Sequence, residues 1–426
     1  MQLKLASYPI MTIRFGSATG LDGTVLVVDA DGLRALLLED PSLLGIDFEI
    51  VRPEESCRAG PVFDIIEPRA KGPDSSPDFP GILGPPETAG MGTTYVLEGA
   101  AVTVLKEVST GDSRGAPGYV LEMSGGAAAG TKYGSLHHLI VIPRTKPGLP
   151  GHSQQKAYRL AGLRAAVYLA RAAANETPAR TQTFAPVDPA VRDREGLPRV
   201  AYVGQIFSRQ RKPELDEQIL YGVGTDGMLP VVLHPDEWLD GALVPSYHNS
   251  LGGAETYFYQ NHPVIGELYR RHHARELNFV GTVATIAAAD NFDRDRNCRF
   301  AANLIRWTLR ADAAVLTKFG GGVPHADLAE TARLLEGMGI KTAVQVTDLA
   351  RDRKVESALL FNFPEVNAIV CIGGNGTSWT VPRLERVIAP NPDMAERLRG
   401  PLELEAMSVI GVCNQQGISR LRAMVY

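Results

Sequence analysis

The stretch AAVLTKFGGGVPHADLAETARLLEGMGIKTAVQVTD, residues 313–348, carries the clearest structural signal of this chain. An apolar run is followed by a helical pattern and then by a second apolar run, which is typical of two parallel strands joined by a helical crossover. We therefore predict that residues 199–426 form a doubly wound, mostly parallel α/β domain. The same alternation appears in RVAYVGQI, LPVVLHP, ELNFVGTVAT, CRFAANLIRWTLR and NAIVCIGG.

Before this domain, short apolar or alternating runs separated by Gly and Pro clusters predict a β-rich N-terminal domain over residues 1–175. One helix is expected there in DADGLRALLLED, which begins with an Asp cap and has leucines at helical spacing. The Ala- and Leu-rich segment 153–174 predicts a longer helix that closes the domain. Residues 176–198 contain four prolines and no sustained period, and we expect an exposed linker.

The composition indicates a globular, cytoplasmic enzyme rather than a nucleic-acid or membrane protein. Of the 426 residues, 44% are hydrophobic, 43 are Lys or Arg and 48 are Asp or Glu, so the formal net charge is −5. No basic excess favours nucleic acid, and no apolar run approaches the length of a transmembrane helix. The four cysteines have no zinc-like spacing and are too few for a disulfide framework, so we expect reduced thiols.

In a doubly wound sheet, ligands bind at the carboxyl ends of the strands, which directs attention to two Gly-rich loops. GGGVPH, residues 320–325, contains Gly321 and precedes a helix, so its amide groups could bind a substrate carboxylate. GGNGTSW, residues 373–379, contains Gly374 and Asn375. Both loops are also explained as ordinary tight turns. Neither has the GxGxxG or P-loop pattern, and we predict no nucleotide cofactor.

A third loop, in DGALVPSYHNSLGGAETYFYQNHPVIGELY (residues 240–269), contains the pair Asn249-Ser250. A hydroxyl held against the preceding carbonyl can convert the amide to an ester, and elimination then leaves a pyruvoyl group, an electrophilic carbonyl that reacts with amines. Asn249, Ser250, Ser246 and His248 are the candidate catalytic residues within a processing loop at 245–256. The alternative is that Asn and Ser begin a turn by bonding their own backbone.

Tyr257, Asn261 and His262 follow this loop and are candidates for substrate binding, although a lone histidine is usually structural. Several histidines lie nearby, but no HxxxH or HxH pair is joined to a carboxylate ligand. The neighbours His272 and His273 would point to different faces of one helix. We therefore predict no metal site.

Blocks distributed over the whole chain resemble the proprotein subunit of glycine, sarcosine and betaine reductase component B, and also that of D-proline reductase. The first block is similar to the family's RPxES, PVxDxIEPR and FPG patterns in order and spacing. The blocks are RPEESCRAGPVFDIIEPRAKGPDSSPDFPGI (52–82), LPRVAYV (197–203), DGALV (240–244), NHPVIGELY (261–269), RELNFVGTVAT (275–285), GMGIKTAVQVTD (337–348), NAIVCIGGN (367–375) and SVIGVCNQQGISRLRAMVY (408–426).

The resemblance implies a substrate-binding subunit that acts in reductive C–N cleavage of an amino acid or N-methylated amine. It further implies a hetero-oligomer with a selenoprotein B-like or Cys-containing reductase subunit. Family members form their pyruvoyl group from a Cys in the loop between the DGA and NPVI blocks, whereas this chain has no Cys in that interval. Ser250 is the preferred match and Ser246 the other one, since serine forms this group in other pyruvoyl enzymes.

A second hypothesis stays open, because the missing Cys also fits a branch that has lost processing. The chain would then be an intact scaffold or regulatory subunit that completes the active site of a partner. The two hypotheses differ in whether the bond between Asn249 and Ser250 is cut.

Overall fold

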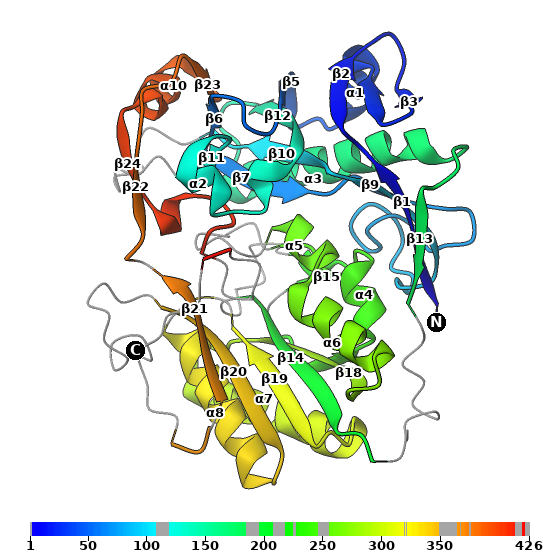
Figure 1. Cartoon of the computed structure of the whole chain (residues 1–426), viewed down its shortest axis with the longest axis vertical. Helices are drawn as coiled ribbons and strands as arrows, with labels where there is room; N and C mark the ends of the chain where they lie inside the picture. The colour runs from blue at the N-terminus through cyan, green and yellow to red at the C-terminus, as the bar shows by residue number, and fades with distance from the viewer. Residues whose placement is uncertain are drawn as a thin grey trace.

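The computed structural model has a strand-rich part, drawn at the top of Figure 1, and a parallel-sheet part, drawn at the bottom. The longest helix, α3 (Gly151–Ala170), belongs to the strand-rich part, and the chain enters the parallel sheet at β14 (Arg199–Phe207). The residues described are 2–107, 119–184, 196–207, 218–224, 227–245, 255–318, 320, 322–348, 364–366, 368–374, 376–413 and 420–421.

Two four-stranded sheets build the strand-rich part, with orders β13-β1-β9-β8 and β5-β12-β10-β7. Both mix parallel and antiparallel neighbours: β1, for example, is parallel to β9 and antiparallel to β13. The predicted β-rich N-terminal half is thus confirmed. Its sheet strands are β1 (Leu3–Pro9), β5 (Leu43–Val51), β7 (Val62–Ile66), β8 (Arg69–Lys71), β9 (Gly92–Glu98), β10 (Ala100–Leu105), β12 (His137–Thr145) and β13 (Arg180–Thr183).

Helices of this part follow the expected local signals. Helix α1 (Ala30–Leu37) begins after Asp29, whose carboxylate accepts hydrogen bonds from the amides of Asp31 and Gly32. Helix α3 covers the second sheet closely because Gly162 has no side chain, and a Cβ atom there would meet Val104 Cγ2 at 2.6 Å. The shorter elements are β2 (Thr12–Phe15), β3 (Gly20–Asp22), β4 (Val25–Val28), α2 (Gly125–Ala129) and the 3-10 turns Tyr133–Ser135 and Arg171–Ala173.

The parallel-sheet part contains a six-stranded sheet with the order β17-β18-β14-β19-β20-β21. All neighbours are parallel except β17, which is antiparallel to β18. The order reverses direction around β14, which confirms the predicted mostly parallel α/β arrangement. The strands after β14 are β15 (Gln218–Leu220), β16 (Val223–Gly224), β17 (Val231–Leu233), β18 (Asn278–Ile286), β19 (Ala313–Thr317), β20 (Lys341–Asp348) and β21 (Ala368–Gly374).

Helices pack on both faces of this sheet. Tyr202 of β14 points to the face covered by α4 (Pro235–Leu239), α5 (Thr256–Gln260) and α6 (Pro263–His273). Its neighbours Ala201 and Val203 point to the opposite face, where α7 and α8 lie. The elements of that second layer are α7 (Asn291–Asn303), a π-helical turn (Leu304–Thr308) and α8 (Val323–Gly337).

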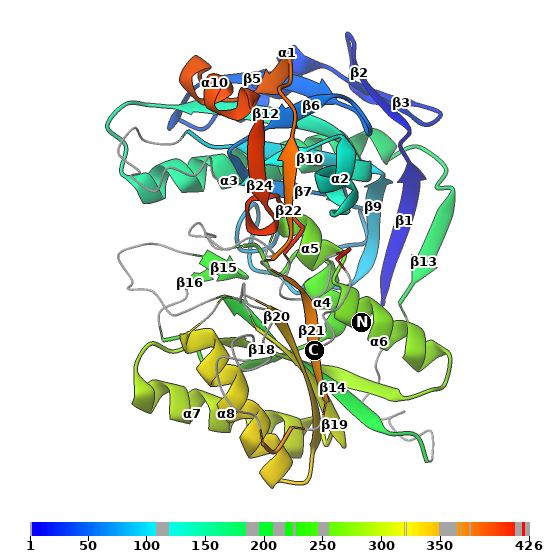
Figure 2. The same ribbon diagram turned by 60° about the vertical axis from the view of Figure 1, so that its left-hand side comes forward.

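After β21 the chain returns to the strand-rich part, as Figure 2 shows for β22, β24 and α10. Strand β23 pairs in parallel with β6 (Cys57–Ala59), so the chain crosses between the two parts a second time. The predicted division at residues 176–198 does not include this return, and the domain boundary itself stays a prediction. The returning elements are β22 (Ser378–Val381), β23 (Arg386–Ile388), α10 (Pro392–Arg399), β24 (Leu402–Glu405) and the 3-10 turn Ala406–Ser408. On its other side β6 pairs with β11 (Leu121–Glu122).

A buried ion pair stabilises the contact between the returning segment and the strand-rich part. Arg58 of β6 is fully buried and donates from Nε to Glu122 Oε2 at 2.6 Å, and from a guanidinium nitrogen to the carbonyl oxygen of Leu398. One side chain therefore contacts β11 and the end of α10. Among the helices within the described residues, none combines the length and apolar composition needed to cross a membrane.

Candidate functional site

The segment from Asp64 to Lys71, at the centre of the PVFDIIEPRAK block, contacts the chain on both sides of residues 246–254. These nine residues, which include Ser246, His248, Asn249 and Ser250, lie outside the described part of the chain. Their neighbours before and after, up to Pro245 and from Glu255, are described and buried. We call the Asp64–Lys71 segment the clasp.

Asp64 provides the first contact of the clasp, with the residue that begins α5. Its Oδ1 accepts the backbone N–H of Thr256 at 2.8 Å and its Oδ2 accepts the Thr256 hydroxyl at 2.6 Å. Burial raises the pKa of Asp64 to about 7, whereas the hydrogen bonds from Thr256 act in the opposite direction. This carboxyl group therefore contacts Thr256, which is the sixth residue after Ser250 in the sequence.

Glu67 and Arg69 form a buried ion pair that extends the clasp to the end of α5. Arg69 donates to Glu67 Oε2 at 2.6 and 2.8 Å, and Asn261 Nδ2 donates to the same oxygen at 3.1 Å. Backbone groups of Glu67 also exchange two hydrogen bonds with the Gln260 side chain. The amide and guanidinium donors compensate a carboxylate that is only 3% exposed.

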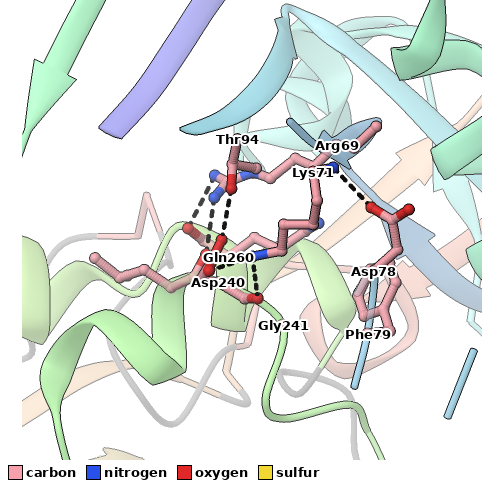
Figure 3. A pocket seen from close by; sticks show the side chains of 10 residues that line it. Arg69, Lys71, Asp78, Phe79, Thr94, Asp240, Gly241 and Gln260 are labelled. Atoms are coloured by element: carbon pink, nitrogen blue, oxygen red, sulfur yellow. Dashed lines mark hydrogen bonds and ion pairs between the residues drawn. The ribbon is translucent and has the colours of Figure 1, made fainter. Parts of the chain in front are cut away.

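Arg69 also reaches the other side of the loop. It donates to the carbonyl oxygen of Leu239 at 2.9 Å, before the loop, and to that of Gln260 at 2.9 Å, after it. Lys71 adds a contact on the first side, where its Nζ forms an ion pair with Asp240 and donates to the Asp240 carbonyl oxygen. Figure 3 shows this cluster around a small pocket, with Lys71, Asp240 and Thr94 joined by dashed lines.

Next to the clasp lies a wide cleft, and two of the predicted substrate-binding residues line it. Its lining includes residues of β1, β9 and β13 and of the turn that contains Lys132 and Ser135. The lining also includes Glu67, Arg69, Tyr257 and Asn261. Residues of the clasp thus bind both flanks of the loop and also line part of the cleft.

Tyr257 is held against the strand-rich part by its neighbours. Glu255 Oε2 accepts a hydrogen bond from the buried Tyr133 hydroxyl at 2.9 Å. The rings of Tyr133 and Tyr257 meet edge to face with their centroids 5.4 Å apart. The backbone of α5 is therefore fixed by Asp64 and Tyr133 before it reaches the cleft.

His262 lies in the core rather than in this cleft. It is 1% exposed, caps α6 through Nδ1, and its Nε2 lies 3.0 Å from the Tyr202 hydroxyl. Burial lowers the pKa of His262 to about 3, so the ring stays neutral. The structural role that a lone histidine usually has accounts for this residue.

The Gly-rich loops give less information about the site. Gly374 ends β21 at the edge of the parallel sheet, whereas Gly321 and Asn375 lie outside the described residues. Next to Gly321, Gly322 caps α8 with a φ of 65°, a conformation that suits glycine. Lys318 lies at the carboxyl end of β19, donates to the carbonyl oxygen of Gly320 at 2.6 Å, and has its pKa lowered to about 8 by burial.

Sequence reasoning missed Asp64, Glu67 and Arg69 as site residues, although the signal was present. Charged residues within the apolar run PVFDIIEPRA must be paired if the run is buried. All four cysteines are buried, and burial raises the pKa of Cys57, Cys298 and Cys413 to about 12. In the described part of the chain, no group of three or more His, Cys, Asp or Glu side chains has the arrangement of a metal site.

Comparisons with known proteins place this clasp and cleft in a family. The family model for the glycine/sarcosine/betaine reductase component B subunits matches residues 1–414. The glycine reductase complex component B subunits alpha and beta of Acetoanaerobium sticklandii are 32% identical, with 100% of both chains covered. The sarcosine reductase complex component B subunit alpha of Peptoclostridium acidaminophilum is 29% identical over 91% of this chain and 89% of the relative. No solved structure matches. The chain therefore belongs to the family of glycine/sarcosine/betaine reductase component B subunits.

Proposed function

We propose that this protein is the substrate-binding subunit of an amino-acid reductase complex that cleaves a C–N bond reductively. The observation that carries the proposal is the full-length family match together with the cleft beside residues 246–254. The names of the relatives describe components of glycine, sarcosine and betaine reductase complexes. We propose for this chain a small amine substrate and a partner subunit with a selenocysteine or cysteine nucleophile.

The reactive carbonyl is proposed to come from Ser250. Attack of its hydroxyl on the Asn249 carbonyl carbon forms an ester and breaks the amide C–N bond. Elimination then releases Asn249 as a carboxylate, and water replaces the nitrogen of residue 250, which leaves as ammonia. The product is a ketone at the new N-terminus, which supplies an electrophilic carbonyl for a substrate amine.

The described residues fit such a group. Thr256 is the sixth residue after Ser250, and an extended chain of six residues spans about 20 Å, so the ketone could reach the cleft. Asp64 holds the flank after the loop and Arg69 holds both flanks, and neither set of contacts requires an uncut chain. In this arrangement Glu67, Tyr257 and Asn261 bind and orient the amine, and the buried α5 limits access of water from one side.

A second function is favoured by one specific observation. No Cys lies between Asp240 and His262, where family members form the pyruvoyl group. An uncut chain would serve as a scaffold that completes the active site of its partner. This alternative uses the same cleft as a contact for the partner and needs no reaction at Ser250.

To test this function, the complex is purified from the organism that produces it, by means of an affinity tag on this chain. With a dithiol as reductant, we expect release of ammonia from glycine or of methylamine from sarcosine. A complex that contains Ser250→Ala should lose this release, while Ser246→Ala retains it. Full activity of the Ser250→Ala complex would favour the scaffold, and no amine release from the wild-type complex would reject the reductase function.

A further inference from the structure

Charged side chains of both signs line the cleft together with Tyr257. Burial raises the pKa of Tyr257, and the negative charges of Glu67 and Glu98 act in the same direction. Arg69 and Arg420 act in the opposite direction. A ligand that reaches Tyr257 therefore encounters two carboxylates and two guanidinium groups.

Most of these charges are already paired within the protein. Glu67 pairs with Arg69 in the clasp, and Glu98 of β9 pairs with Arg180 of β13 at 3.1 Å. Arg420 and one further cation that lines the cleft, Lys132, form no ion pair with any described residue. The cleft thus has a net positive corner, which Lys132 and Arg420 form on either side of Ser135.

The geometry of that corner is fixed by a short turn. The Ser135 hydroxyl donates to the carbonyl oxygen of Lys132 at 2.8 Å and accepts a hydrogen bond from Arg420 at 3.4 Å. Tyr133, between them in sequence, is fully buried and bonds Glu255 next to the loop. One side of this turn therefore supports α5, while its other side presents Lys132 and Ser135 to the cleft.

We propose that Lys132 and Arg420, positioned by Ser135, form a carboxylate subsite of this cleft. The ligand class is a carboxylate-bearing primary or secondary amine, with its carboxylate at this corner and its nitrogen toward Glu67 and Asn261. A quaternary ammonium is less well suited, because such groups favour cages of several aromatic rings. Tyr257 is the one Phe, Tyr or Trp among the described residues that line the cleft.

The assignment of the ligand's amine to Glu67 and Asn261 rests on the proposed function, but binding of the ligand's carboxylate can be tested independently of it. Isothermal titration of the full-length protein with acetate, glycine and methylamine separates the two ends of the ligand. Lys132→Met and Arg420→Met should each weaken binding of acetate and glycine about tenfold, because each removes a charged hydrogen-bond donor. Methylamine affinity should not change, and Arg420→Lys should retain part of the affinity for acetate.

Lys146→Met, on an exposed segment away from the cleft, is the matched control and should bind all three ligands as the wild type does. Unchanged acetate and glycine affinities in both Met variants, or no acetate binding to the wild type, would overturn the subsite. If the variants lose acetate affinity but the wild-type chain contains no reactive carbonyl, the subsite stands and the proposed pyruvoyl chemistry fails. Loss of methylamine affinity in the Met variants would contradict the orientation.

Discussion

At the scale of single residues, Asp64 links the stability of the fold to pH. Its pKa is about 7 in the folded protein and close to 4 in an unfolded chain, because burial disfavours the carboxylate. Below pH 4 the carboxyl group is neutral in both the folded and the unfolded state, so its burial does not lower the free energy of unfolding. As the pH rises from 4 to 7 the unfolded state ionises first, so the contribution of Asp64 to stability falls and its full cost is present above pH 7.

We expect Asp64→Asn to remove this pH dependence. The amide oxygen can still accept the Thr256 N–H, while the Thr256 hydroxyl can turn to accept from the new NH2 group. Relative to the wild type, the variant should gain up to about 4 kcal/mol in free energy of unfolding between pH 4 and pH 8. Urea unfolding at several pH values measures this difference.

Asp47→Asn serves as the control, since Asp47 is half exposed and pairs with Arg144 on the surface. Its difference from the wild type should stay nearly constant with pH. A constant difference for Asp64→Asn as well would show that Asp64 is not the buried titrating group inferred here.

At the scale of elements, the clasp determines where α4 and α5 end relative to each other. Arg69 is bonded to the last residue of α4, Leu239, and to the last residue of α5, Gln260. The planar guanidinium group makes these contacts in addition to its bonds to Glu67, which a lysine could not reproduce. Strand β8 therefore orients both flanks of the candidate loop through one side chain.

Arg69→Met should destabilise the protein by about 3–5 kcal/mol, because it leaves Glu67 buried without its partner. The combined variant Arg69→Met, Glu67→Met should cost less than the sum of the two single changes. Arg271→Met, which removes an exposed pair with Glu267, should cost less than about 1 kcal/mol. Denaturant unfolding of these proteins tests the clasp, and equal losses for Arg69→Met and Arg271→Met would contradict it.

The elements themselves were largely predictable, because local patterns specify them. The Asp29 cap, the leucine spacing of α1 and the alternation from β14 to β21 all appear in the sequence and in the structure. The contacts of Asp64, Arg69 and Arg58 were not predictable, since each joins residues that are far apart in the chain. The position of His262 was also undecided by sequence, because a helix cap and a substrate ligand use the same residue type.

At the scale of the whole molecule, the candidate cut would divide a single interlocked fold. Strands β14 and β17 precede residue 249, and their partner β18 follows it in the same sheet. Strand β23, near the C-terminus, pairs with β6 of the strand-rich part. Two fragments that end and begin at the candidate bond would therefore share one sheet, the clasp and the β6–β23 pair. We expect them to remain together under native conditions.

The most direct measurement is the intact mass of the purified protein, recorded under native and denaturing conditions with and without phenylhydrazine. The central claim predicts one particle under native conditions and two fragments after denaturation, which divide between Asn249 and Ser250. The C-terminal fragment should gain the phenylhydrazine adduct, and Ser250→Ala should give one uncut chain. A single unmodified chain of 426 residues from wild-type protein purified with its partner would contradict the claim.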